Sequence, residues 1–327
     1  MKAVLCKEWG PPESLVLEEI PSPSPGKGQI VITVKACGVN FPDTLIIEGK
    51  YQTKPDLPFS PGGEVAGIVK EVGEGVKHLK VGMPVFCLTG FGGFAEEVLA
   101  EASVTFPIPP SMDFLNASAI SLTYGTSIHA LKDRAQLKAG ETLLVLGAAG
   151  GVGLAAIQLG VQMGARVIAA ASTDEKLAFC RANGASETIN YRTEDLKARL
   201  KELTDGQGVD VAYDPVGGEY TEIVVRSMAW NGRLLVVGFA AGDIPAIPLN
   251  LPLLKVCQIV GVFWGRFARS FPQQNMANFM QLIQWFQEDK LKPHIYKTYS
   301  LDQAAAALKD ITDRKVMGKV VLLTDAN

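Results

Sequence analysis

The stretch Leu143-Leu144-Val145-Leu146-Gly147-Ala148-Ala149-Gly150-Gly151-Val152-Gly153 decides the fold, because an apolar run enters a glycine-rich turn that opens a helix of small residues. Glycines in such a turn let the backbone approach a pyrophosphate, and the helix N-terminus offers unpaired N–H groups to the anion. We therefore predict a dinucleotide-binding turn in which Gly150, Gly151, Val152 and Gly153 contact the cofactor. Ala148 replaces the first glycine of the G-x-G-x-x-G pattern, so a purely structural turn is the alternative.

The residues that follow the next predicted strand favour NADPH over NADH. NAD-binding proteins place an acidic residue about 20 residues beyond the glycines, where it holds the ribose hydroxyls. This chain has Ala171-Ser172-Thr173 there, and Lys176 lies one turn into the next predicted helix. Ser172 and Lys176 would therefore meet a 2′-phosphate with a hydroxyl and a cation, while Tyr191 and Arg192 are expected to pack on the adenine and add charge. The alternative for Lys176 is an ordinary solvated lysine.

Two different rhythms along the chain predict two domains. The first third alternates short β-branched runs with glycine and proline, which indicates a mostly β lobe. From about Thr123 apolar strands alternate with helices, which indicates a doubly wound parallel sheet. We expect a dinucleotide-binding domain over 123–263 and a first domain over 1–122, to which the tail 264–327 returns. The predicted strands are Ile30–Val34, Val65–Val72, Val85–Leu88, Phe94–Val98, Thr142–Leu146, Arg166–Ala171, Val209–Tyr213, Arg233–Val237 and Lys319–Leu323, and the predicted helices include Glu175–Asn183, Met276–Asp289 and Ala304–Ile311.

Composition excludes several classes of protein. The 327 residues are 47% hydrophobic and 20% charged, which is typical of globular domains with large cores. A net charge of −3 supplies no basic field, so we expect a small-molecule partner and neither nucleic acid nor a membrane. No apolar run is long enough for a membrane span, which predicts a cytoplasmic protein. The five cysteines and three histidines are scattered without metal-ligand spacing, so we expect reduced thiols and no metal.

Further motifs give the chain a family resemblance that covers essentially its whole length. It resembles the zinc-independent quinone oxidoreductases of the medium-chain dehydrogenase/reductase superfamily, and in part their quinone-oxidoreductase-like branch. The resemblance implies a GroES-like, mostly β catalytic domain and a Rossmann domain. The motifs are Val34-Lys35-Ala36-Cys37-Gly38-Val39-Asn40-Phe41-Pro42-Asp43, Pro61-Gly62-Gly63-Glu64-Val65-Ala66-Gly67, the glycine loop, Tyr213-Asp214-Pro215-Val216-Gly217-Gly218, Val236-Val237-Gly238-Phe239 and Gly261-Val262-Phe263-Trp264-Gly265.

The resemblance also implies the site residues and the absence of zinc. Zinc-dependent relatives carry a cysteine where Asn40 stands and a histidine where Gly63 stands, so the metal ligands are missing. Alcohol oxidation needs a Lewis acid or a general base, and it is therefore disfavoured. By resemblance, the nicotinamide lies between the lobes. The residues expected near it are Asn40, Thr126, Val216, Gly238, Phe239, Phe263 and Trp264.

The acceptor is expected to be a quinone or, alternatively, an activated alkene such as an enone or enoyl thioester. A quinone yields a hydroquinone anion that solvent protonates, whereas an alkene needs a donor for the developing enolate oxygen. Tyr51 falls where related enoyl reductases place a catalytic tyrosine, although it could equally line the cleft. Asn40 is expected to bind the nicotinamide ribose or the substrate oxygen, or else to cap backbone groups, and Asp43 is expected to be structural. Leu45 stands where some quinone reductases carry a tyrosine.

Assembly and a non-catalytic alternative complete the expectations. The apolar run Ile259–Trp264 resembles the edge strand through which family members form homodimers, although an internal strand would look the same. Since some relatives serve as lens crystallins, a non-catalytic NADPH-binding protein of crystallin-like or RNA-binding type is the alternative from another class.

Overall fold

The computed structural model describes residues 1–325, and the chain divides into two compact units. Unit 1 comprises Met1–Leu122 and Lys292–Asn327, of which the last two residues lie outside the described part, and unit 2 comprises Thr123–Leu291. The first boundary is at the expected position, but the second lies after residue 291 rather than after residue 263.

Two helices, α9 (Trp264–Ser270) and α10 (Pro272–Gln287), account for this difference. The Phe267 ring of α9 stacks on His129 with ring centroids 3.9 Å apart, and Asn278 Nδ2 of α10 donates to Asp133 Oδ2 at 2.8 Å. His129 and Asp133 lie on a π-helix, η3 (His129–Arg134), near the start of unit 2. These contacts place 264–291 in unit 2 and correct the expectation that this segment belongs to the first domain.

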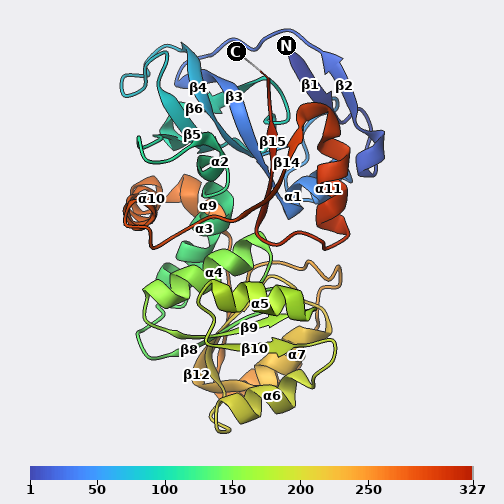
Figure 1. The fold of residues 1–327 in the computed structure, drawn as a ribbon, viewed down its shortest axis with the longest axis vertical. Coiled ribbons are helices and arrows are strands. Elements are labelled where there is room, and N and C mark those ends of the chain that lie inside the picture. The colour runs from blue at the N-terminus through green and yellow to red at the C-terminus, as the bar shows by residue number, and fades with distance from the viewer. Residues whose placement is uncertain (326–327) are drawn as a thin grey trace. The chain divides into compact units, whose positions relative to one another are not determined.

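Unit 2 is a doubly wound α/β fold around six parallel strands in the order β10-β9-β8-β11-β12-β13. Figure 1 shows α4 and α5 on one face of the sheet and α6 and α7 on the other. The chain runs outward from β8 in one direction and later from β11 in the other, so a topological switch point lies between these two strands. The remaining bounds are α3 (Ser121–Ile128), β8 (Thr142–Val145), α4 (Gly151–Gln162), β9 (Arg166–Ala171), α5 (Asp174–Ala182), β10 (Glu187–Asn190), α6 (Leu196–Leu203), β11 (Val209–Asp214), α7 (Glu219–Arg226), β12 (Met228–Val236), α8 (Asn250–Lys255) and β13 (Gln258–Gly261).

Unit 1 is built on a seven-stranded, mostly antiparallel sheet. Its main order is β14-β15-β3-β4-β5-β7, and β6 pairs with β3 beside this path. The C-terminal strand β15 pairs with β3, so the tail returns to the first lobe as expected. The bounds are β1 (Lys2–Leu5), η1 (Pro12–Ser14), β2 (Val16–Glu19), β3 (Gln29–Val39), α1 (Phe41–Ile47), β4 (Glu64–Val72), β5 (Pro84–Leu88), β6 (Glu97–Glu101), η2 (Ala102–Val104), β7 (Thr105–Pro107), α2 (Phe114–Ala117), β14 (Ile295–Ser300), η4 (Leu301–Gln303), α11 (Ala304–Thr312) and β15 (Lys319–Leu323).

One predicted strand of unit 1 is shifted, and one ambiguous strand is resolved. β6 begins at Glu97, three residues later than expected, because the Phe94 backbone bonds to Val4 and Pro61 instead of pairing with β3.

β13 is an edge strand of the unit 2 sheet, which excludes the alternative that Ile259–Trp264 contains an internal strand. Within residues 1–325, no helix combines the length and the apolar composition needed to cross a bilayer.

Candidate active site

The predicted cofactor residues of unit 2 gather at one edge of its sheet. Parallel pairing places Asn190 of β10 opposite Ala171 of β9, and Val236 of β12 opposite both Asp214 of β11 and Gly261 of β13. The loops that follow these strands therefore leave the sheet on the same side. Ligands of open α/β sheets bind outside the carboxyl ends of the strands, at the switch point. These loops, together with the first turns of the helices that follow them, carry Gly150, Gly151, Val152, Gly153, Ser172, Lys176, Tyr191, Val216, Gly238, Phe239, Phe263 and Trp264.

The glycine loop has the geometry that a diphosphate requires. Gly150 is the N-cap of α4, with extended backbone angles and no side-chain cap hydrogen bond, so no capping side chain occupies the amides of the first turn. A Cβ added to Gly153 would lie 2.4 Å from the carbonyl oxygen of Gly147, whereas one added to Gly150 would have only that oxygen nearby, at 3.4 Å. Gly153 is thus needed for helix packing, and Gly150 leaves room for a ligand. The loop fits the pyrophosphate of a dinucleotide.

The ends of β9 and β10 carry the groups predicted to select the cofactor. Thr173 caps α5 by accepting from the Lys176 amide at 3.3 Å, which places Ser172 and Lys176 on one turn. Asp174 is the first acidic residue after β9, but its Oδ1 accepts from Asn190 Nδ2 at 2.8 Å. This bond orients the carboxylate toward β10.

An aromatic partner for Tyr191 escaped the sequence reasoning. Tyr220 of α7 lies against Tyr191, with ring centroids 4.7 Å apart and planes tilted by 45°. The only feature of the sequence that could have identified Tyr220 is its position in the first turn of the helix that follows β11. Arg192 is exposed.

Two networks of buried hydrogen bonds hold the loops around β11. Asp214 Oδ1 accepts from the amides of Val216 and Gly217, both at 2.8 Å, and this fixes the turn after the strand. The Ser127 hydroxyl lies 3.0 Å from the Val152 carbonyl and 2.9 Å from the Tyr213 hydroxyl. Ser127 has a single hydroxyl proton, which it donates to the carbonyl, so Tyr213 donates to Ser127.

These networks join three of the predicted cofactor segments. Ser127 is the neighbour of Thr126 on α3, and the Val152 carbonyl lies in the first turn of α4. The loop after β12 joins them, because the Ala241 amide donates to the Val216 carbonyl at 2.8 Å. The structure thus brings the segments of Thr126, Val152, Val216 and Phe239 into one hydrogen-bonded assembly.

Phe263 and Trp264 separate into different environments. Trp264 is 5% exposed, its Nε1 donates to Asn275 Oδ1 at 3.0 Å, and its ring meets Phe279 edge-on. Its indole N–H and one side of its ring contact α10, so the side chain is buried within unit 2, and the contact of Trp264 with the cofactor stays a prediction. Phe263 is half exposed and keeps an available ring.

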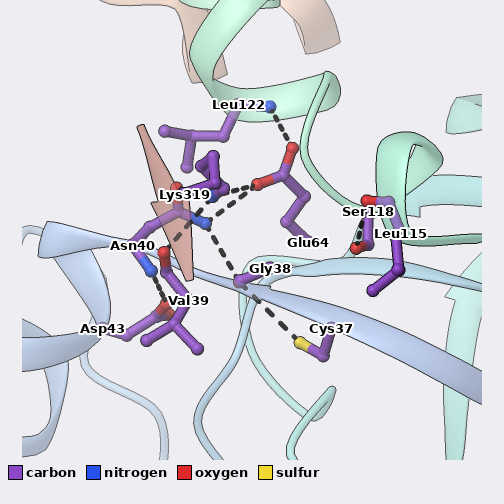
Figure 2. Close-up of polar contacts among 10 residues, drawn as sticks. All are labelled: Cys37, Gly38, Val39, Asn40, Asp43, Glu64, Leu115, Ser118, Leu122 and Lys319. Atoms are coloured by element: carbon purple, nitrogen blue, oxygen red, sulfur yellow. Dashed lines mark hydrogen bonds and ion pairs between the residues drawn. The ribbon is translucent and has the colours of Figure 1, made fainter. Parts of the chain in front are cut away.

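A buried polar cluster surrounds Asn40 at the N-terminus of α1 (Figure 2). Lys319 Nζ of β15 lies 2.5 Å from Asn40 Oδ1 and 2.8 Å from Glu64 Oε2 of β4. Asn40 Nδ2 donates to the same Glu64 oxygen at 3.0 Å and to the Gly38 carbonyl at 3.1 Å. Glu64 Oε1 accepts from the Leu122 amide at 2.8 Å. The side chain of Asn40 is therefore held by a buried ion pair, and Asn40 and Asp43 form a capping box at the start of α1.

Asp43 and Cys37 lie beside this cluster. Asp43 Oδ2 accepts a hydrogen bond from the backbone N–H of Asn40 at 2.7 Å, which fits the structural role expected of Asp43. Burial is the main cause that raises the pKa of Asp43 to about 7, against the opposing effect of its backbone hydrogen bonds and of Lys319. Burial likewise raises the pKa of the Cys37 thiol well above its ordinary value, so this thiol is a poor nucleophile.

Sequence reasoning missed Glu64 and Lys319 as members of the site. Glu64 was only part of a family motif, and Lys319 only the first residue of a predicted strand. The available signal was that each of two otherwise apolar runs begins with a charged residue. These runs are Lys319-Val320-Val321-Leu322 and Glu64-Val65-Ala66. A charge in such a place requires a buried partner.

Tyr51 lies beyond the opposite end of α1 from Asn40. It follows Gly49 and Lys50, whose amides bond back to Ile46 and Leu45 at the end of the helix. Tyr51 is half-buried and packs against the hydrophobic core of unit 1.

Among the described residues, no group of three or more histidine, cysteine, aspartate or glutamate side chains is placed to hold a metal ion. Gly63 offers no side chain, and Asn40 is bonded within its cluster. The absence of zinc remains a prediction.

Comparisons with known proteins agree with this architecture. Residues 26–110 match the alcohol dehydrogenase GroES-like domain, and residues 151–285 match the zinc-binding dehydrogenase domain. The chain is 42% identical to a quinone oxidoreductase-like protein 2 homolog of Nematostella vectensis, over 99% of this chain and 89% of that protein. The crystal structure of Escherichia coli quinone oxidoreductase complexed with NADPH superimposes with a TM-score of 0.92, at 30% identity, over 99% of this chain and 100% of that one. An enoyl reductase structure gives a TM-score of 0.89 at 25% identity, over 99% of both chains.

A GroES-like unit and a Rossmann unit with a glycine loop at its switch point define a medium-chain dehydrogenase/reductase. Within that superfamily, the chain belongs to the quinone oxidoreductase family. It is an oxidoreductase of the quinone-oxidoreductase-like kind.

Proposed function

We propose that this chain is an NADPH-dependent reductase that transfers hydride to a quinone without a metal ion. The observation that carries the proposal is the set of loops at the carboxyl ends of β8, β9 and β10. They combine the glycine loop with Ser172 and Lys176, while the carboxylate of Asp174 is bonded to Asn190. A 2′-phosphate is thus accepted by a hydroxyl and a cation rather than repelled. The related Escherichia coli enzyme, crystallised with NADPH, supports this choice of cofactor.

Each group of residues has a role in the proposed reaction. The first-turn amides of α4 hold the diphosphate, Lys176 and Ser172 hold the 2′-phosphate, and Tyr191 with Tyr220 packs on the adenine. Val216, Gly238, Phe239, Phe263 and Thr126 line the nicotinamide end, and Asn40 keeps its predicted role toward the nicotinamide ribose or the substrate oxygen. When bound, NADPH supplies the hydride. The protein orients the acceptor and excludes water, and solvent supplies the proton that completes the hydroquinone.

An activated alkene is the second candidate acceptor, and Tyr51 favours it. Its hydroxyl is a suitable donor for an enone or enoyl thioester carbonyl, on which negative charge develops as hydride reaches the β-carbon. The structural likeness to an enoyl reductase adds support. A non-catalytic NADPH-binding role, of crystallin-like or RNA-binding type, predicts binding without turnover.

The deciding experiment is a steady-state acceptor screen with NADPH and NADH in parallel. A quinone, a small enone and an enoyl thioester would each be tested, with metal content measured on the same preparation. Quinone reduction with NADPH preferred is the expected result. If the protein binds NADPH but no acceptor oxidises it, the proposal that the chain is a reductase is overturned. An RNA titration of the NADPH-saturated protein would then test the non-catalytic, RNA-binding role.

We further propose that the protein forms a homodimer through the edge strand β13. Ile259 lies on this strand and is 43% exposed. The outer edge of β13 pairs with no other strand of the sheet, so its backbone groups are open to a second chain. Leu253 and Leu254 of the preceding helix α8 are at least 70% exposed. An exposed apolar patch beside an open strand edge is typical of an interface between subunits.

A further inference from the structure

Asn190, the last residue of β10, is the centre of a small hydrogen-bond network within unit 2. It is 5% exposed and pairs with Ala171, the last residue of β9. Its Nδ2 donates to Asp174 Oδ1 at 2.8 Å, and its Oδ1 accepts from the Arg192 amide at 3.2 Å. The backbone N–H of Asn190 donates to Glu194 Oε2 at 2.7 Å. One buried residue thus joins the first turn of α5 to the turn after β10.

The neighbours of Asn190 fix the orientation of its carboxamide. Turned over, the carboxamide would place its oxygen against the carboxylate of Asp174 and its NH₂ group against the N–H of Arg192. Both contacts would become repulsive, so Asn190 presents its donor to Asp174. A hydrogen bond to a carboxylate is charge-assisted and therefore strong. The exposed side chain of Asp174 is thus held on a buried group.

The position of Asp174 gives this bond a consequence for the cofactor. Asp174 is the first residue of α5, so it lies in the same turn as Ser172 and Lys176, just beyond the end of β9. In NAD-binding proteins an acidic residue near this strand end accepts hydrogen bonds from the ribose hydroxyls. A carboxylate that turned to the ribose here would favour NADH and repel the 2′-phosphate of NADPH.

We propose that Asn190 is a positioning residue for cofactor selection. It holds the carboxylate of Asp174 beside β10 and so keeps it from the ribose, which leaves Ser172 and Lys176 to receive the 2′-phosphate. In this role Asn190 acts through Asp174 and needs no contact with the cofactor. The inference rests on the proposed function, which places NADPH at these strand ends.

Asn190→Ala separates this role from a purely structural one. The variant loses the side-chain bonds to Asp174 and Arg192 but keeps the backbone N–H that Glu194 accepts. Glu194 also keeps its ion pair with Arg199, so the freed charge is that of Asp174. Fluorescence titrations with NADPH and NADH in parallel measure the two Kd values.

The two cofactors should respond to Asn190→Ala in opposite directions. We expect the Kd for NADPH to rise roughly tenfold, because the freed carboxylate of Asp174 repels the phosphate. The Kd for NADH should fall, because the same carboxylate accepts from the 2′-hydroxyl. A structural role would weaken both cofactors by the same factor, since they share the adenine and the diphosphate, and this result would overturn the proposal.

Double variants show whether the effect passes through Asp174. When Asn190→Ala is combined with Asp174→Ala the carboxylate is gone, so the ratio of the two Kd values should return to within about twofold of the wild-type ratio. Asn190→Ala combined with Glu175→Ala is the matched control, because it removes the neighbouring carboxylate of the same turn instead of the one that Asn190 binds. A ratio restored by neither combination, or equally by both, would overturn the positioning role.

Asp174→Ala alone tests the proposal while the buried Asn190 is left in place. Because the wild-type carboxylate is already held, its removal should change the Kd for NADPH by less than about twofold. If this variant bound NADPH about tenfold more tightly, the carboxylate would face the phosphate in spite of Asn190, and the proposal would be overturned.

These outcomes differ from a failure of the proposed function. A wild type that binds NADPH no more tightly than NADH would refute the cofactor preference, and the inference with it. A wild type that prefers NADPH, together with an unchanged ratio in Asn190→Ala, would refute the inference alone. The titrations contain no acceptor, so both results are independent of whether the substrate is a quinone or an activated alkene.

Discussion

Lys319 and Glu64 form their 2.8 Å ion pair across the strand β3, directly over Gly38. A Cβ on Gly38 would lie 2.1 Å from the Ser118 carbonyl oxygen, 2.8 Å from the Glu64 carboxylate and 3.1 Å from the Lys319 ammonium, so glycine makes room for the Ser118 backbone and for the pair. Buried ion pairs of this kind add little net stability, but removing one partner costs about 3–5 kcal/mol because the other charge remains buried. The pair therefore serves to fix the position of Asn40 more than to stabilise the unit.

Two alanine substitutions in the glycine loop should separate folding from cofactor binding. Gly153→Ala places a Cβ 2.4 Å from the Gly147 carbonyl oxygen and should lower the free energy of unfolding by about 1–3 kcal/mol, as overpacking does. Gly150→Ala has room within the protein and should leave the thermal midpoint unchanged, yet its methyl group would obstruct the diphosphate. We expect Gly150→Ala to weaken NADPH binding roughly tenfold or more. Normal affinity in Gly150→Ala would contradict the assignment of this loop.

Lys176→Ala should change the cofactor preference. Removing a charged partner of the 2′-phosphate is expected to raise the Kd for NADPH roughly tenfold and to leave the Kd for NADH unchanged. Lys197→Ala, which removes an exposed lysine of α6, is the matched control. Parallel titrations with both cofactors measure the effect, and equal changes for the two would show that Lys176 does not contact the phosphate.

Tyr51→Phe should distinguish the two candidate acceptors. If Tyr51 donates a proton or a hydrogen bond to an alkene substrate, kcat for an enone should fall about 100-fold while quinone turnover stays the same. Tyr296→Phe, at an exposed tyrosine of β14, provides the control. Unchanged enone turnover in Tyr51→Phe would leave this tyrosine as a lining residue.

Asp43→Asn should alter the dependence of stability on pH. The pKa of Asp43 is about 7 in the folded protein against an ordinary value of 3.8, so between these two values the folded state holds the proton more tightly than the unfolded state. The contribution of Asp43 to the free energy of unfolding therefore falls as pH rises through this window, by about 4 kcal/mol in total. The carboxamide of the Asp43→Asn variant has no such proton to lose, so this variant should gain stability relative to the wild type from pH 4 to pH 7.

Urea denaturation at several pH values measures this difference. The exposed Asp56 provides the control substitution Asp56→Asn, for which we expect no such trend. A constant difference between Asp43→Asn and the wild type across the window would mean that Asp43 is ionised in the folded protein throughout.

Ile259→Lys should convert the proposed homodimer into a monomer. A lysine on an edge strand opposes pairing with another strand, because its charge would have to be desolvated. Val81→Lys introduces the same change at an exposed valine of unit 1 and should leave assembly unaffected. Light scattering after size-exclusion chromatography measures the mass, and a wild type that is monomeric at micromolar concentration would refute the interface.

Local patterns were sufficient to predict most of the elements. Arg166–Ala171 and Lys319–Leu323 were predicted with the bounds that the structure shows, since both are apolar runs between clear turn signals. Local patterns did not predict that residues 264–291 belong to unit 2. Their place there depends on side-chain contacts such as Asn278 with Asp133, which join residues 145 positions apart. Periodicity identifies a helix but not the unit against which it packs.

The same distinction applies to the candidate site. The glycine loop was predictable because strand, turn and helix are contiguous, so that their residues alone specify the geometry. The cluster of Asn40, Glu64 and Lys319 was not, because Glu64 and Lys319 are 255 positions apart and meet only through the register of β4, β3 and β15. The bond from Trp264 Nε1 to Asn275 Oδ1 was likewise not predictable, because Asn275 lies on the next helix and nothing in the local sequence pairs the two residues.

The place of β15 in the sheet has a consequence for how the protein is made. Unit 2 is continuous in sequence, so all of it has been synthesised before the ribosome adds Lys319. Until that residue emerges, Glu64 has no cation beside it, and Ala36–Val39 of β3 lack the strand that covers them. Because domains fold as units during synthesis, the Rossmann half can form first, and the half that carries Asn40 and Tyr51 is completed only by a strand that is synthesised after it.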